Sequence, residues 1–300
     1  MFFLKPVLLA LLVLSASTRV AAISLAGTLN SFEGKVWVNE ALVRPINGGT
    51  RALEVGRVLR TEHGMAEILL APGSFLRLGE RSKLTLEPIG MPDARARLES
   101  GEALLEAIAL PGPIVLEQDG VSAVIRKPGL YGFDQKHAMI SVYVGEAQFH
   151  KGGYQTIVGH GFSVGGRHLR KFALSPPGGS LFSWSKLRSE LLSDESAAVA
   201  QTPGWHGPDW YRVPWSDSYT FLSASGVSIG PFGWPYYSPG YLPNSIPTHP
   251  SGDTYLYGPP VISLPVPGHT DEPPGLVSPG PGTAPYTVPL TLPGVPRFPR

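Results

Sequence analysis

Polar and apolar residues alternate in short runs from Gly27 to about Ser175. In "SFLRLGERSKLTLEP" every second residue of each run is apolar, at Leu76, Leu78, Leu84 and Leu86. A period of two predicts β-strands, with these leucines facing a core and polar neighbours such as Arg77 facing water. Gly and Pro in "APGS" and "LGERS" supply turns, and similar runs follow up to "YQTIVG". This regular short spacing favours a sandwich, barrel or short solenoid over a βαβ fold.

The stretch "ARARLESGEALLEAIAL" is compatible with two kinds of element. Leu98, Leu105 and Ala109 fall near a helical stripe, but Gly101 costs about 1 kcal/mol relative to Ala inside a helix. "LESGEALLE" also matches "VYVGEAQFH", a β-rich stretch around Gly145. We therefore predict strand, glycine turn and strand in both stretches. The carboxylates of the first stretch are expected to be solvated, at Glu99, Glu102 and Glu106.

The hydrophobic period changes after residue 180. "SLFSWSKLRSELLSDESAAVAQ" places large apolar residues at helical spacing, at Leu181, Trp184, Leu187 and Leu191. This predicts one amphipathic helix over residues 180–201, with Ser180 or Ser183 as its N-cap and Pro203-Gly204 as its stop. Trp184 is expected to anchor the core.

Residues 203–242 are rich in aromatic side chains. Such a segment either wraps a domain surface or forms an exposed interaction site. We predict an interaction surface here, formed by Trp205, Trp210, Tyr211, Trp215, Tyr219, Phe221, Trp234, Tyr236 and Tyr237. Because flat rings also stack on sugars, the alternative is a carbohydrate- or peptidoglycan-binding module that uses Trp205, Trp210, Trp215 and Trp234.

Both ends of the sequence differ from this middle part. Residues 1–22 resemble a cleavable signal peptide, with Lys5, an apolar run from Val7 to Leu14 and small residues up to Ala22. That run is shorter than the roughly 20 residues that span a bilayer, so we expect a periplasmic or secreted chain that is not integral to the membrane after cleavage near Ala22. Residues 243–300 are rich in proline, which predicts a disordered, extended tail.

Composition excludes several classes of function. The chain has 36 Gly, 32 Pro and no Cys, so thiol chemistry, disulfides and cysteine-ligated metals are absent. A net charge of +1 does not provide the excess of positive charge that is typical of nucleic-acid-binding proteins. The basic stretch "GGRHLRK" at 165–171 contains no interleaved aromatics, and we interpret it as a solvated guard of an edge strand. The histidines are scattered without metal-binding spacing, so no metal or cofactor is expected.

The sequence "GFSVG" at 161–165 formally matches the G-x-S-x-G motif of esterases, with Ser163 as the candidate nucleophile. In esterases the serine occupies a strained turn between a strand and a helix. Here "GRHLRKFALS" follows and alternates like another strand. We therefore expect Ser163 to be a strand or turn residue, and a serine hydrolase is only a minor alternative to a noncatalytic chain.

Residues 34–166 resemble a FecR domain. The stretches that carry the resemblance are "GKVWVN", "GRVLRTEHGMAEILLAPGSFLRLGERSKLTLE", "ARARLESGEALLE", "SAVIRKPGLYGF" and "ISVYVGEAQFH", in this order. The segment "YTFL…GPFGWPYYSP" is also similar to the C-terminal region of exported FecR-domain proteins. The resemblance implies an extracytoplasmic all-β domain over residues 23–176, built as a β-sandwich or short β-solenoid.

The same resemblance implies function through protein contact. FecR domains receive a signal from a TonB-dependent transporter and pass it through an anti-sigma region to a sigma factor. This chain begins with a signal-peptide-like segment instead of a cytoplasmic region, which puts transmembrane signalling in doubt. The resulting hypothesis is a noncatalytic, exported interaction or scaffold protein of the bacterial cell envelope. Its expected partners are envelope proteins, such as a TonB-dependent transporter or an anti-sigma component, or cell-wall glycan.

Overall fold

The computed structural model describes residues 25–44, 51–52, 57–87, 94–166, 168–175, 177–201, 208–216 and 218–241. The predicted signal peptide (1–22), Trp205 and the predicted proline-rich tail (243–300) lie outside the described residues. The predicted helix stop at Pro203-Gly204, Arg167 of the basic stretch and parts of the predicted β domain also lie outside them.

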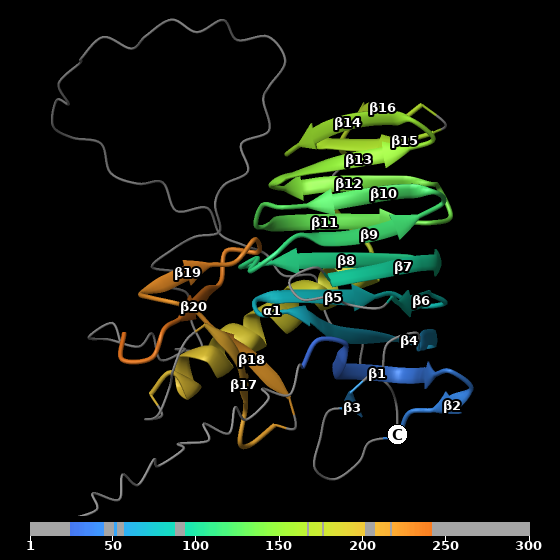
Figure 1. Cartoon of the computed structure of the whole chain (residues 1–300). Coiled ribbons are helices and arrows are strands. Elements are labelled where there is room, and N and C mark those ends of the chain that lie inside the picture. The colour runs from blue at the N-terminus through green and yellow to red at the C-terminus, as the bar shows by residue number, and fades with distance from the viewer. Residues whose placement is uncertain are drawn as a thin grey trace, which may run out of the picture. The chain divides into compact units, whose positions relative to one another are not determined.

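Most of the described chain forms a single β-sheet (Figure 1). Its strands are β1 (Thr28–Val38), β2 (Ala41–Leu42), β3 (Arg51–Ala52), β4 (Val58–Ala71), β5 (Ser74–Leu78), β6 (Lys83–Leu86), β7 (Ala94–Ser100), β8 (Glu102–Ala107), β9 (Ile114–Gln118), β10 (Val121–Ile125), β11 (Gly129–Asp134), β12 (Met139–Val144), β13 (Glu146–Lys151), β14 (Tyr154–Gly159), β15 (Phe162–Gly165) and β16 (Arg170–Ala173).

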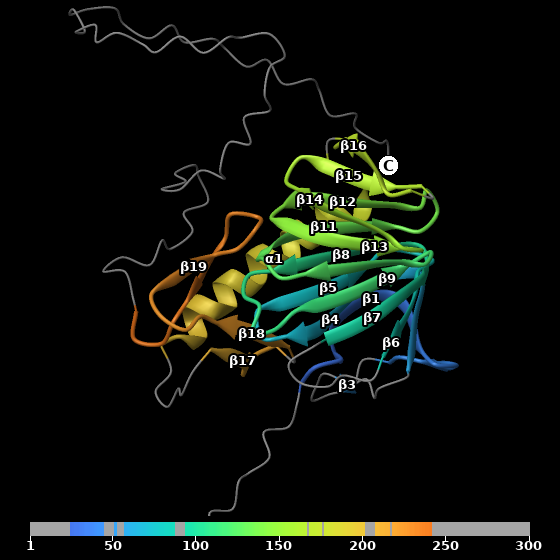
Figure 2. The same cartoon turned by 45° about the horizontal axis from the view of Figure 1, so that its top comes forward.

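This sheet folds over itself into two layers. The strand order is β14-β13-β10-β9-β7-β6-β4-β5-β8-β11-β12-β15-β16. We call β6, β7, β9, β10, β13 and β14 the first layer, and β5, β8, β11, β12, β15 and β16 the second layer. The long strand β4 joins them, because its start pairs with β6 and its end pairs with β5. Figure 2 gives a second view of these strands, in which those of the two layers overlap. The prediction of an all-β fold is confirmed, and the arrangement is a sandwich made from one sheet.

The space between the layers is filled by the apolar residues that the alternation identified. The four leucines at 76, 78, 84 and 86 are each at most 1% exposed. They belong to one core cluster with residues of both layers, among them Leu105, Leu116, Tyr131, Phe133, Val142 and Phe149. Burial of this apolar area is the main driving force for the fold.

Two glycines lie at the turns where the chain passes from one layer to the other. They are the central glycines of the two matching stretches "LESGEALLE" and "VYVGEAQFH". Gly101 (φ +82°) connects β7 to β8, and Gly145 (φ +92°) connects β12 to β13. Both backbones are in the left-handed region, where glycine avoids the steric cost of a Cβ. The predicted strand–glycine–strand units are therefore confirmed, and each one is a corner of the sandwich.

The corner at Gly101 leads to a stability prediction. A Cβ at this position would lie 2.2 Å from Oγ and 2.5 Å from Cα of Ser82. Gly101→Ala is therefore expected to lower the free energy of unfolding by about 2–4 kcal/mol, from strain at positive φ plus this clash. Gly120→Ala is the control, since Gly120 has a φ of +70° but nothing within 4 Å of an added Cβ. Urea denaturation should show a loss of only about 1 kcal/mol for the control, and equal losses would contradict the steric argument.

The outer face of the second layer carries a further set of elements, which we call the cover. These are α1 (Ser180–Val199), β17 (Asp209–Arg212), β18 (Tyr219–Leu222), β19 (Val227–Ile229) and β20 (Pro235–Tyr237). The strands pair as two hairpins, β17–β18 and β19–β20. Because β5 lies between the core and the cover, all five of its residues are buried.

The predicted helix is present, but its buried face is not the predicted one. Leu181 and Trp184 are buried as expected, whereas Leu187 and Leu191 are 65% and 46% exposed. The helix instead packs small hydroxyl residues against the sheet and hairpins, at Ser185, Ser189, Ser193 and Ser196. The N-cap prediction is also wrong, because Gly179 occupies that position without a side-chain hydrogen bond. Small serines let the helix approach a polar sheet face, which a search for large apolar residues misses.

Candidate functional site

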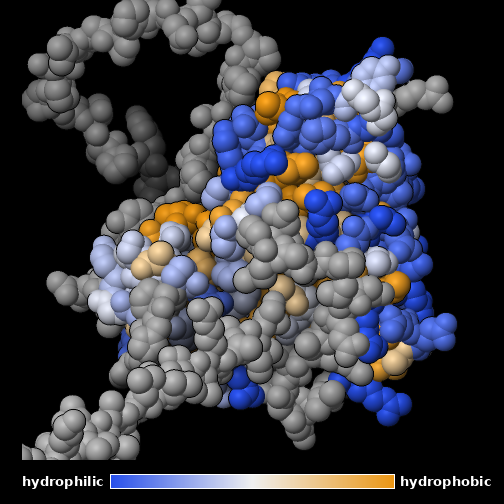
Figure 3. Space-filling model, in the orientation of Figure 1, coloured by the Kyte–Doolittle hydropathy of each residue, from blue (hydrophilic) through white to orange (hydrophobic). Residues whose placement is uncertain are grey.

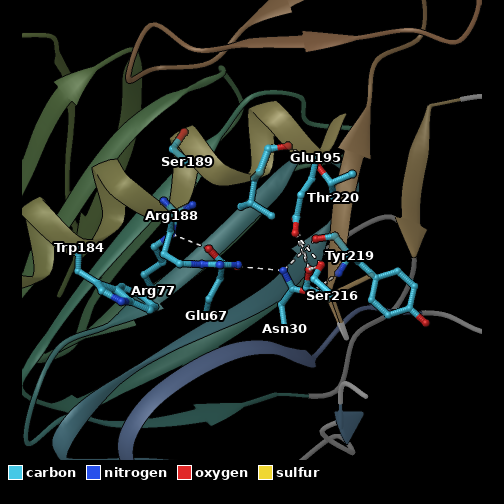
Figure 4. Close-up of polar contacts among 12 residues, drawn as sticks. Asn30, Glu67, Arg77, Trp184, Arg188, Ser189, Glu195, Ser216, Tyr219 and Thr220 are labelled. Atoms are coloured by element: carbon cyan, nitrogen blue, oxygen red, sulfur yellow. Dashed lines mark hydrogen bonds and ion pairs between the residues drawn. The ribbon is translucent and has the colours of Figure 1, made fainter. Parts of the chain in front are cut away.

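A group of charged side chains lies between the second layer and the cover (Figure 4). We call Glu67 of β4, Arg77 of β5, Glu106 of β8 and Arg188 of α1 the buried ion cluster. The side chains of the first three are 0% exposed, and that of Arg188 is 11% exposed. The predictions that Arg77 faces water and that Glu106 is solvated are therefore wrong. Both residues do point away from the leucine core, but the cover removes that face from solvent.

Arg77 bridges the two carboxylates of the cluster. Its Nε donates to Oε2 of Glu67 at 2.8 Å, and its Nη1 donates to Oε2 of Glu106 at 2.7 Å. From the helix, Nη2 of Arg188 donates to the other Glu67 oxygen at 2.8 Å. A buried charge is tolerated only when it is paired and hydrogen-bonded, and this arrangement pairs each charge of the cluster.

Glu106 occupies a different electrostatic environment from Glu67. Burial raises the pKa of Glu106, and the charge of Arg77 offsets only part of that effect. The second Glu106 oxygen accepts a hydrogen bond from Oγ of Ser189 at 2.7 Å. The hydroxyl of Tyr236 lies 3.3 Å from the same Ser189 oxygen, so helix α1 and strand β20 both close over this carboxylate.

Glu67 should make the stability of the fold depend on acid pH. Burial opposes its ionisation, but the charges of Arg188 and Arg77 lower its pKa from 4.5 to about 2. A carboxyl with a lowered folded-state pKa contributes stability above the unfolded value and loses it as the pH falls through the folded value. We expect about 3 kcal/mol of stabilisation to disappear between pH 4.5 and about 2.

The matched variant for this prediction is Glu67→Gln, whose side chain does not titrate. Urea denaturation at stepped pH should give two stabilities that differ at neutral pH and converge towards pH 2. The raised pKa of Glu106 acts in the opposite sense, since its contribution falls as the pH rises, but it is present in both proteins. A constant difference across the interval would contradict the pairing of Glu67.

Further polar contacts fasten the cover at each end. Asn30 of β1 donates from Nδ2 to Glu67 at 2.9 Å and to the carbonyl of Tyr219 at 2.9 Å, and its Oδ1 accepts the Tyr219 amide at 2.7 Å. At the other end of α1, buried Glu195 accepts a hydrogen bond from Oγ of Ser216 at 2.6 Å. Burial raises the pKa of Glu195. These contacts place the β17–β18 hairpin against both the helix and the sheet.

The helix serines also bind the hairpin backbones directly. Ser193 donates to the carbonyl of Pro235 at 2.6 Å, and Ser196 accepts the amide of Tyr237 at 3.1 Å. The hydroxyl of Thr220 donates to the carbonyl of Leu192 at 2.6 Å. Backbone groups buried under the cover thus find partners. The buried ion cluster therefore acts as a structural latch between the helix and the sheet, and its three sheet residues have no exposed side-chain area.

The sequence contained a signal for this latch. Arg77 lies in "SFLRL" and Glu106 in "ALLEAIAL", each as a single charge within an otherwise apolar run. A single charge in such a run on a central strand indicates burial on both faces with a partner of opposite charge. The partner Arg188 has no comparable signal, because it lies in a helix with several polar neighbours.

The predicted aromatic surface is largely part of the interior. Trp210 and Phe221 pack on Phe75 of the sheet, with ring centroids 4.9 Å apart for Phe75–Trp210 and 6.1 Å apart for Trp210–Phe221. The buried rings are Trp210, Phe221, Tyr236 and Tyr237, and the half-buried ones are Tyr211, Tyr219 and Trp234. A buried ring has no free face for a ligand. Of the predicted surface residues that the structure describes, Trp215 alone is mostly exposed, at 63%.

Ser163 lies in the middle of strand β15 and is 4% exposed. Its Oγ is 2.8 Å from Oγ of Ser141 on the paired strand β12. Strand β16 follows, so the turn into a helix that exposes an esterase nucleophile is missing. Both serines line a hollow of ≈ 520 Å³ with Asp134 and His137. Within the described ranges, His137 Nδ1 is hydrogen-bonded to Asp134 Oδ2, and no histidine is hydrogen-bonded to Ser163.

Two other features are absent from the described residues. No three His, Asp or Glu side chains there converge so that they could hold a metal ion. Among the same residues, no helix combines the length and apolar character that spanning a bilayer requires.

Comparisons with known proteins give little guidance. No family model matches the chain, and no curated protein is significantly similar to it. Two crystal structures of a provisionally assigned anti-sigma factor from Parabacteroides distasonis are partly similar. The first has 12% identity and a TM-score of 0.34, over 45% of this chain and 64% of that chain. The second has 11% identity and a TM-score of 0.35, over 55% and 82%. This chain spans less than two thirds of the first structure, and both TM-scores are too low to transfer a role.

Proposed function

We propose that the chain is a noncatalytic, exported, FecR-like interaction or scaffold protein of the bacterial cell envelope. The observation that carries this proposal is that the cover is held by buried polar contacts and exposes large apolar side chains. Polar side chains such as Arg188, Ser189 and Thr220 hold the cover together and to the sheet, while several of its exposed side chains are large and apolar.

The exposed side of α1 presents two leucines one turn apart. Leu187 and Leu191 are 65% and 46% exposed, and residues four apart lie next to each other on a helix surface. Trp215, in the turn between β17 and β18, is another exposed apolar residue of the cover, at 63%. The adjacent Ser216 is tied to buried Glu195, which holds this turn on the helix. We propose that these residues form one exposed apolar patch, since such a patch marks a contact site.

The FecR resemblance supplies the class of partner. It implies an envelope protein, either a TonB-dependent transporter or an anti-sigma component, and we propose that this protein binds the exposed side of the cover. The alternative partner is cell-wall glycan stacked on Trp215. That alternative is the weaker one, because Trp210 is buried and Trp234 is half-buried, whereas sugar binding usually draws on more than one open ring.

In-cell crosslinking tests this proposal. A photoreactive amino acid replaces Trp215 or Leu187 in the full chain, and captured partners are identified by mass spectrometry. Leu42 of β2 is the control site, because it is also an exposed apolar residue, at 39%, but lies outside the cover. Capture of a transporter or anti-sigma protein from the cover sites alone supports the proposal. Capture of muropeptides supports the glycan alternative, and equal capture from Leu42 would contradict the cover as the contact site.

A further inference from the structure

The sheet has a free end where both layers stop. Strand β14 closes the first layer and β16 closes the second, and among the described strands each is paired on one side only. We call β14, β15 and β16 with their connecting turns the distal end. It exposes about half of each of four large side chains, Tyr154 (49%), Ile157 (52%), Phe162 (47%) and Phe172 (45%). Figure 3 shows hydrophobic and strongly hydrophilic residues intermingled at this end of the molecule.

The charges at the distal end have a single sign. No Asp or Glu occurs in the sequence between Glu146 and Glu190, and β16 exposes Arg170 and Lys171. Of the acids on other strands, Asp119 is paired with Lys151 at 3.0 Å and Glu146 with Lys127 at 2.8 Å. Asp134, which lines a hollow with Glu102 and Phe172, is paired with His137. The distal end is therefore cationic as well as apolar.

The structure also brings the cations and the aromatic rings together. The rings of Tyr154 and His168 lie 4.8 Å apart, so the β13–β14 turn touches the β15–β16 turn across the two layers. Lys171 is paired with Val164 on β15, where Phe162 lies two residues away. In the fold His168 contacts the ring of Tyr154, and Arg170 and Lys171 lie on the same strand as Phe172.

We propose that the distal end binds the surface of an anionic phospholipid bilayer. Exposed rings at the tip can enter the headgroup region, while arginine and lysine reach lipid phosphates. The insertion has to be shallow, because the unpaired backbone groups of the two edge strands need water or headgroups as partners. A second copy of the chain fits less well, since docking two distal ends would bring Arg170 and Lys171 against the same cations. This surface is separate from the cover used in the proposed function.

Co-sedimentation of the full chain with vesicles tests this inference. We expect binding to vesicles that contain phosphatidylglycerol and little binding to pure phosphatidylcholine. Raising salt from about 0.1 M to about 1 M should weaken binding strongly, because the Debye length falls from about 10 Å to about 3 Å. Lys171→Glu should lower the partition coefficient about 30-fold, since it removes one favourable charge and adds an unfavourable one. Phe162→Ser should lower it about tenfold through lost apolar burial.

Matched controls separate the distal end from other contributions. Lys35→Glu reverses an exposed charge on β1, which is paired with β4 far from the edge strands. Leu187→Ser removes an exposed apolar side chain from α1. Both controls should bind like the original chain, and the apolar run Val7–Leu14 contributes equally to all variants. Absence of binding to anionic vesicles, equal binding to neutral ones, or an equal loss in Lys35→Glu overturns the inference. So does capture of an acidic protein at the distal end without vesicle binding.

Discussion

Replacing Arg77 by methionine is expected to lower the free energy of unfolding by about 3–5 kcal/mol, the usual cost of removing one partner from a buried ion pair. The side chain has no exposed area and hydrogen-bonds to both Glu67 and Glu106. Without it, Glu106 loses its paired cation, and Glu67 keeps only Arg188. Urea or thermal denaturation followed by circular dichroism measures the loss.

Arg97→Met is the matched control for this prediction. Arg97 also contacts two carboxylates, those of Glu87 and Glu117, but its side chain is 54% exposed. Exposed ion pairs contribute up to about 1 kcal/mol, so the control should lose little stability. Adding Glu106→Gln to Arg77→Met should recover part of the loss, because it removes an unpaired buried charge. Equal losses in Arg77→Met and Arg97→Met would show that water reaches the buried ion cluster.

Trp210→Ala is expected to lower the free energy of unfolding by about 3–5 kcal/mol, as for other large aromatic residues removed from a core. The ring is 7% exposed and joins Phe75 of the sheet to Phe221 of the cover. Its loss leaves a cavity between the second layer and the β17–β18 hairpin. The same denaturation experiment measures the effect.

Trp215→Ala provides the comparison within the same hairpin. Trp215 is 63% exposed, and substitutions of exposed residues usually change stability by less than about 0.5 kcal/mol. The two variants therefore separate the core role of one tryptophan from the proposed contact role of the other. If Trp215→Ala destabilised the protein as much as Trp210→Ala, the exposed side of the cover would not be free for a partner.

The strand pattern was predictable because it depends on local order in the sequence. Alternation at Leu76 and Leu78 identifies the face that a core buries, and a glycine between two runs identifies a corner such as Gly101. Each of these features requires only neighbouring residues. For the same reason the helix was found at the correct place, since a period near 3.6 is also a local property.

Alternation alone does not reveal the latch, because it cannot show whether the second face of a strand is also covered. The only signal is the single charge in each apolar run, and it names no partner. Arg77 and Glu106 follow the rule for solvent-facing positions until the cover, more than 70 residues later in the chain, packs onto them. The serine face of α1 depends on this packing as well. Ser189 and Ser193 have no clear periodic signal of their own, and their role exists only against Glu106 and the Pro235 carbonyl.

The aromatic segment shows a related limit. Tryptophan and tyrosine suit both a core and an interface, since each combines a large apolar body with a polar group. Sequence therefore left burial open for Trp210, Trp215 and Tyr236. The structure separates them by position, because Trp210 and Tyr236 lie on hairpin strands and pack with Phe75 of the sheet, whereas Trp215 lies in a turn.

The contact between Asn30 and Tyr219 has a consequence for how the chain acquires its structure. The two residues are 189 positions apart, and contacts between such distant parts of a chain form late and slow folding. Most strands of the sheet pair with near neighbours, so the sheet can assemble before the cover is complete. If the sheet assembles first, Leu69, Phe75 and the charges beneath α1 stay in water until the cover docks. Such an intermediate would bind hydrophobic dyes and be prone to aggregation, which makes rapid docking of the cover the step on which successful folding depends.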